Sequence, residues 1–88
     1  MNAVQIEPSR VRNPIDFDAN GRQAGVLRAP LSRNDSGWGV VEIPIVSIKN
    51  GSGPTVLFTG GIHGDEYEGQ IAISRLAQTL DPARVQGR

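Results

Sequence analysis

Hydrophobic and polar residues alternate over two stretches in the first half of the chain, and a period of two predicts β-strands. Residues 22–32 form the first candidate strand and residues 38–49 the second, with the polar turn sequence of residues 33–37 between them. β-Branched residues occupy one face of the second strand: Val41, Ile43 and Ile45. Pro44 cannot donate a ladder hydrogen bond, so we expect this strand at a sheet edge or with a bulge. The two strands together predict an antiparallel hairpin.

A continuous apolar run and then a helical pattern follow the hairpin. Residues 55–58 are apolar and flanked by turn residues, which is typical of a short strand covered on both faces. From about Glu66 the hydrophobic period changes to 3.6 and predicts an amphipathic helix. Asp65 is the expected N-cap, Glu68 falls in the first turn, where negative charge is favoured, and Asp81-Pro82 ends the helix.

These elements predict an α/β fold. Residues 1–20 contain prolines and no clear period, so we expect an extended N-terminal lead-in. Residues 21–88 supply a hairpin, a central strand and one helix, which leaves a sheet face and a strand edge uncovered. We therefore expect residues 21–88 to be the N-terminal portion of a larger α/β domain.

Composition narrows the class of protein. The 88 residues allow one small domain or a piece of a larger one, and about half are apolar when Gly is included, as in globular chains. No apolar run approaches the roughly 20 residues of a membrane span. Nine basic and nine acidic residues cancel without a basic cluster, so we expect neither nucleic acid nor membrane as partner. The chain has no cysteine and no secretory pattern at its start, and we expect a cytoplasmic protein.

Candidate chemistry is concentrated in the glycine-rich turn between the apolar run and the helix. It contains His63, the sole histidine of the sequence, and Glu66 three residues later. In open α/β sheets ligands bind beyond the carboxyl ends of the strands, where this turn is expected to lie. Imidazole nitrogen and carboxylate oxygen are both zinc ligands, so His63 and Glu66 form a candidate partial zinc site. The alternative is a loop histidine beside a glutamate that stabilises the helix N-terminus.

Two other chemistries fit the sequence poorly. A phosphate-binding loop would need a G-x-G-x-x-G or Walker spacing, and three carboxylates within residues 65–68 would repel phosphate. A serine nucleophile would need a G-x-S-x-G elbow, whereas Ser52 lies in a turn with no helix directly after it.

Residues 60–69, GGIHGDEYEG, resemble the zinc-ligand motif of the succinylglutamate desuccinylase/aspartoacylase family, relatives of the zinc carboxypeptidases. Residues 21–39 are similar to the branch of that family which contains N-acetyl-diaminobutyrate deacetylases. The resemblance implies a zinc-carboxypeptidase-like α/β domain that hydrolyses the amide bond of a small N-acyl amino acid. It also implies one Zn²⁺ ion, with His63 and Glu66 as two of three protein ligands. We expect Asp65 to cap the helix or hold the loop rather than to bind the ion.

Several functional residues of the family pattern have no counterpart in this sequence. The family's third ligand, a histidine, its general-base glutamate and its substrate-binding arginine and asparagine lie further downstream. We therefore assign no catalytic residue within the chain and expect an inactive N-terminal fragment of the enzyme or a truncated gene product. Two alternatives stay open: a non-catalytic structural chain, and a partial metal-binding chain that works with another chain. The sequence does not determine the oligomeric state.

Overall fold

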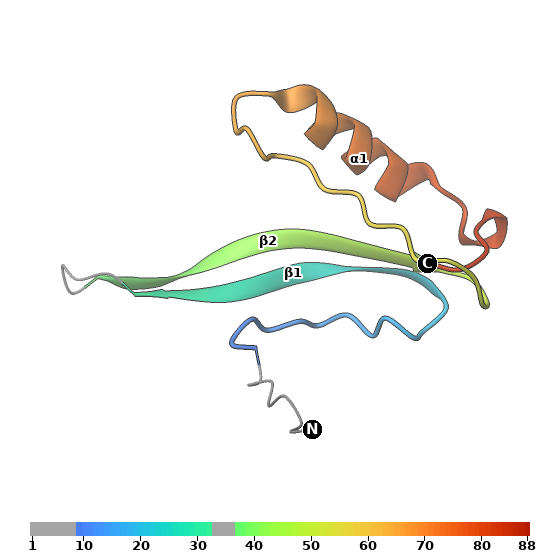
Figure 1. Cartoon of the computed structure of the whole chain (residues 1–88), viewed down its shortest axis with the longest axis horizontal. Helices are drawn as coiled ribbons and strands as arrows, with labels where there is room; N and C mark the ends of the chain where they lie inside the picture. Colours follow the sequence, from blue (N-terminus) through green and yellow to red (C-terminus); the bar gives the residue numbers. More distant parts are fainter. Residues whose placement is uncertain (1–8, 33–36) are drawn as a thin grey trace, which may run out of the picture.

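The computed structural model describes residues 9–32 and 37–88, and within them a long β-hairpin dominates (Figure 1). Strand β1 (Gly21–Ser32) pairs antiparallel with β2 (Trp38–Lys49), in a one-to-one register from Gly21 opposite Lys49 to Ser32 opposite Trp38. Pro44 lies opposite Val26 without a bulge, and each strand is an edge of this two-stranded sheet. The predicted hairpin is confirmed, while the turn at residues 33–37 falls largely outside the described residues.

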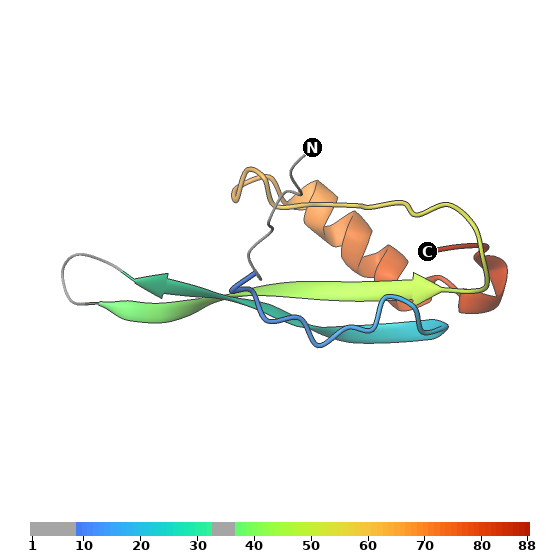
Figure 2. The ribbon, with the colours of Figure 1, turned by 60° about the horizontal axis from the view of Figure 1, so that its bottom comes forward.

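The lead-in, residues 9–20, runs beside the hairpin without forming a helix or a strand (Figure 2). It joins β1 through a backbone bridge in which Arg12 N donates to Arg28 O over 2.9 Å and Arg28 N to Arg12 O over 3.0 Å. The side chain of Gln23 accepts from Asp16 N and donates to Asp16 O, over 3.0 and 2.6 Å. Ile15, 8% exposed, is the buried hydrophobic side chain of the described residues.

The apolar run at residues 55–58 is extended, but the prediction of a buried strand is wrong. Val56, Leu57 and Phe58 are 61, 83 and 61% exposed. A strand needs a hydrogen-bonded neighbour, and only one end of this segment has one: Arg88 N donates to Pro54 O over 2.9 Å and Val56 N to Arg88 O over 2.8 Å. The described residues provide no strand to pair with the rest of the run, which therefore stays uncovered.

Helix α1 (Tyr67–Thr79) follows the glycine-rich turn, as predicted. Its N-cap is Glu66, without a side-chain capping hydrogen bond, so the assignment of Asp65 as N-cap is wrong. The reason is a tight turn in which Glu66 N donates to His63 O over 3.0 Å, and the helix begins only after that turn is closed. Glu68 lies in the first turn as expected, and the helix ends before the short 3₁₀ helix η1 (Pro82–Arg84).

The C-terminal residues connect segments that are distant in sequence. Gly87 forms an antiparallel bridge with Asn50. The Arg88 guanidinium donates to Phe17 O over 2.7 Å and to Thr55 Oγ1 over 3.2 Å, and lies 5.4 Å from the centre of the Phe17 ring. These contacts hold the lead-in and the extended segment at one end of the hairpin.

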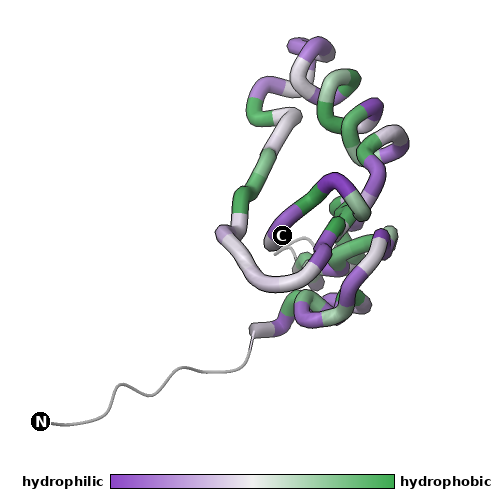
Figure 3. The backbone as a smooth tube through the Cα atoms, turned by 90° about the vertical axis from the view of Figure 1, so that its right-hand side faces the viewer, coloured by the Kyte–Doolittle hydropathy of each residue, from purple (hydrophilic) through white to green (hydrophobic). Residues whose placement is uncertain are grey.

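The molecule has an open shape rather than a packed core. Its radius of gyration is 16.3 Å, whereas a compact domain of this length would have about 12 Å. Figure 3 shows hydrophobic positions on the extended segment, the helix and the hairpin alike, and no residue of α1 is buried. Among the described residues, no helix is long and apolar enough to cross a membrane.

Candidate metal site at the glycine-rich turn

Two glycines let the chain pass closely along the first turns of α1. A Cβ on Gly60 would lie 2.9 Å from Ile73 Cδ1 and 3.3 Å from Gln70 N. Gly61 has a φ of +87°, a backbone conformation that residues with a Cβ rarely adopt. The turn therefore depends on both glycines, and His63 follows two residues after Gly61.

The structure brings the two predicted metal ligands to one place. His63 and Glu66 are the first and last residues of the tight turn, and both line a hollow of about 450 Å³. Glycine backbone and Ile62 form much of the remaining wall, and Glu68 also lines the hollow. The sequence identified Glu68 only as a residue of the first helical turn, so its place in this wall was not predicted.

The donor set suits zinc but amounts to part of a site. One imidazole and one carboxylate are ligand types that Zn²⁺ accepts, and catalytic zinc sites use three protein ligands and keep the fourth position for water. Within residues 9–32 and 37–88 no three His, Cys, Asp or Glu side chains are grouped so that they could hold an ion. His63 and Glu66 are both exposed, so an ion would be accessible to solvent and to further ligands.

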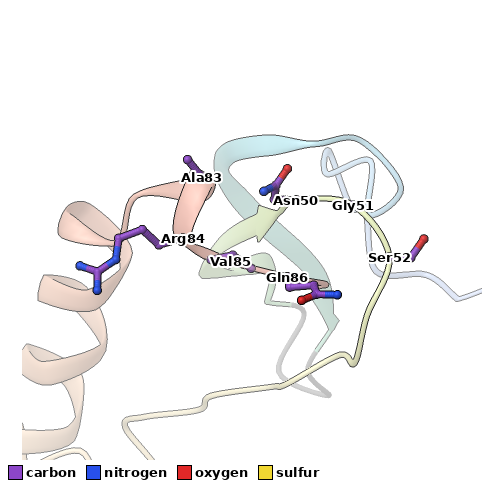
Figure 4. Close-up of a pocket in the computed structure, with 7 residues that line it drawn as sticks. All are labelled: Asn50, Gly51, Ser52, Ala83, Arg84, Val85 and Gln86. Carbon is purple, nitrogen blue, oxygen red and sulfur yellow. The ribbon is translucent and has the colours of Figure 1, made fainter.

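A second hollow, of about 460 Å³, lies beyond the C-terminal end of α1 (Figure 4). Backbone and side chains of two segments line it: residues 50–52 and residues 83–86. Arg84 is the charged residue of this wall, and its side chain extends away from Asn50 and Gln86. No group of potential ligands lines this second hollow.

The hairpin, the extended segment, the turn and the helix are together the N-terminal part of an α/β catalytic domain of the desuccinylase type, as comparison with solved structures shows. The chain is similar to the succinylglutamate desuccinylase/aspartoacylase family. Residues 52–88, which include His63 and Glu66, match the model of the succinylglutamate desuccinylase/aspartoacylase catalytic domain.

Three relatives show the extent of the match. The N-alpha-acetyl-L-2,4-diaminobutyric acid deacetylase of Halomonas elongata is 49% identical over 84 residues, which are 96% of this chain and 25% of that protein. The crystal structure of a succinylglutamate desuccinylase/aspartoacylase from Rhodobacter sphaeroides is 73% identical, with a TM-score of 0.78, over 90% of this chain and 24% of the other. The product-bound structure of the ectoine utilization protein EutE (DoeB) from Ruegeria pomeroyi is 46% identical, with a TM-score of 0.80, over 93% of this chain and 25% of the other. The chain therefore spans about a quarter of the length of these relatives.

Proposed function

We propose that this chain provides the N-terminal, metal-binding part of a zinc-dependent hydrolase that cleaves the amide bond of a small N-acyl amino acid. The observation that supports the proposal best is that His63 and Glu66 line one hollow, inside the stretch that matches the family's catalytic domain. The absence of cysteine, and with it of disulfides, suits an enzyme that acts in the cytoplasm.

The two residues have distinct parts in this proposal. His63 offers a neutral imidazole nitrogen, and Glu66 offers a carboxylate whose negative charge offsets that of a divalent cation. His63 and Glu66 would hold a zinc ion as two of its ligands, and such an ion would supply polarisation of the acyl carbonyl and a bound water that ionises near neutral pH. We place the third ligand and the group that moves the proton outside the described residues, because none of their His, Cys, Asp or Glu side chains, Glu68 included, is grouped with His63 and Glu66 so as to complete a site. The chain alone is accordingly inactive.

The relatives suggest which substrate to try first. The Halomonas protein is a deacetylase of N-alpha-acetyl-L-2,4-diaminobutyric acid, and the Ruegeria protein takes part in ectoine utilization. We therefore propose that the substrate is an N-acyl amino acid, and N-acetyl-diaminobutyrate is the first candidate. A succinylated amino acid is the second candidate, because the Rhodobacter structure carries the desuccinylase name.

A chimera tests the proposal. The matching first quarter of the Halomonas deacetylase is replaced by this chain, and zinc content and hydrolysis of N-acetyl-diaminobutyrate are measured. Glu66→Gln keeps the side-chain size but removes the charge that holds the ion, so we expect loss of zinc and of turnover. Glu68→Gln is the matched control in the same hollow, and we expect it to keep most of both.

Three outcomes would contradict the proposal. Equal losses from Glu66→Gln and Glu68→Gln would mean that the ligand pair is misassigned. Zinc content unchanged by His63→Ala would favour the structural alternative, in which the turn binds no metal. Full turnover after the metal has been removed by a chelator would exclude the zinc mechanism.

A further inference from the structure

A side chain of the hairpin binds the C-terminal end of α1. Arg22 lies at the start of β1, and its Nε donates to Ala77 O over 2.9 Å. Its Nη2 donates to the carbonyl oxygen of Leu80, the C-cap residue. The guanidinium thus uses two donors of its planar fork on the carbonyl groups that a helix leaves unpaired at its C-terminal end.

The charge of Arg22 also complements the helix dipole. The C-terminal end of a helix carries a partial negative charge and is stabilised by cations. The last turn of α1, all of which the structure describes, contains no basic residue of its own. Arg22 supplies that positive charge from a position 55 residues away from Ala77 in sequence.

This contact matters for the site because α1 is loosely held and carries Glu66 at its other end. None of the 13 residues of the helix is buried, so packing restrains its orientation weakly. The helix is about 20 Å long, and a tilt of about 10° around its C-terminal end would move its N-terminal end by about 3 Å. Metal–ligand distances tolerate only about 0.2 Å.

We propose that Arg22 is a positioning residue: by binding the C-terminal end of α1 to the hairpin, it sets the orientation of the helix and thereby the place of Glu66. The effect of Arg22 on the metal site rests on the proposed function, in which Glu66 is a metal ligand. The binding of the helix by Arg22 is independent of any metal.

The orientation of α1 can be measured with labels attached to introduced cysteines, because the chain has no cysteine of its own that would also react. Cysteines introduced at Val41 on the hairpin and at Ala72 on α1, both exposed, carry nitroxide labels. Pulsed electron paramagnetic resonance then gives the distance distribution between hairpin and helix. Dilution with unlabelled chain removes distances between molecules. We expect one narrow distribution for the native residue and a broad one for Arg22→Gln.

Two further variants separate the positioning role from a general loss of structure. Arg28→Gln removes another exposed arginine of β1, whose partner is Glu42 at 3.6 Å, and should leave the distribution narrow. Arg22→Lys keeps the charge but donates from a single ammonium group, so we expect a partial recovery relative to Arg22→Gln. The same narrow distribution in Arg22→Gln and the native chain would overturn the proposal, as would a broad distribution in the native chain.

The metal arm of the experiment uses the unlabelled chain and Zn²⁺ alone, in competition with a chromophoric chelator. We expect Arg22→Gln to weaken zinc binding about tenfold, the usual effect of removing a group that orients a metal ligand, and Arg28→Gln to leave it unchanged. Unchanged zinc binding in Arg22→Gln, together with a broad distance distribution, would refute the link to Glu66. Zinc binding insensitive to His63→Ala would instead refute the proposed metal site, while the distance measurement would still decide the role of Arg22.

Discussion

At the scale of single residues, the glycines of the turn decide where His63 can lie. Gly61 adopts a φ of +87°, and the position of a Cβ on Gly60 is close to the side chain of Ile73. Gly64, three residues after Gly61, has neither constraint: no atom lies within 4 Å of the place where its Cβ would be. The same residue type thus has different functions within one short turn.

Alanine substitutions in the chimera test this difference. We expect Gly61→Ala to lower the free energy of unfolding by about 1–2 kcal/mol, because alanine disfavours positive φ. Gly60→Ala should also destabilise the protein, because the end of the Ile73 side chain can move but the backbone nitrogen of Gln70, 3.3 Å from the added Cβ, is held in the helix. Gly64→Ala is the control and should change stability by less than about 0.5 kcal/mol. Urea unfolding measures all three, and an equal cost at the three positions would refute the described turn geometry.

At the scale of elements, the extended segment at residues 55–58 has the composition of a strand without the surroundings of one. Leu57 is 83% exposed, yet the run is apolar and one end pairs with Arg88. Burial needs neighbours on both sides, and in a chain of about a quarter of its relatives' length those neighbours are absent from the described residues.

The effect of Leu57→Ala should therefore depend on the context of the segment. In this 88-residue chain we expect a change in stability below about 0.5 kcal/mol, as for exposed positions. In the chimera, where the rest of the domain can cover the segment, we expect a loss of about 2–5 kcal/mol, as for a buried leucine. Denaturant unfolding of both proteins measures the contrast, and a small effect in the chimera would mean that the segment is exposed there too.

At the scale of the whole molecule, the chain exposes much of its apolar surface. One end of the hairpin extends beyond the other elements (Figures 1 and 2), and large hydrophobic side chains on it are 45–51% exposed: Leu31, Val40, Val41 and Ile43. Chains of this size without disulfides or a bound metal are marginally stable.

We expect the isolated chain to self-associate and to unfold over a broad temperature range. Exposed apolar surface favours association, and few buried side chains give little cooperativity. Sedimentation velocity measures the association, and circular dichroism measures the breadth of the melt. A monomer with a sharp, cooperative transition would show that the chain folds as a self-sufficient domain.

The sequence by itself determined the features that depend on local patterns. Alternation of apolar residues gave the hairpin, the period of 3.6 gave α1, and the short spacing of His63 and Glu66 placed both at one turn. His63 and Glu66 are only three residues apart, so backbone geometry alone keeps these two candidate ligands near each other. The residue pattern around them also indicated the family whose catalytic-domain model matches residues 52–88.

Only the tertiary structure decided the features that depend on distant contacts. The exposure of residues 55–58 follows from which strands are present to pair with them, and composition does not encode that. The N-cap is Glu66 rather than the expected Asp65, because the turn closes one residue later than the sequence suggested. The binding of α1 by Arg22 joins groups 55 and 58 residues apart, and no local period or spacing records a contact over that separation.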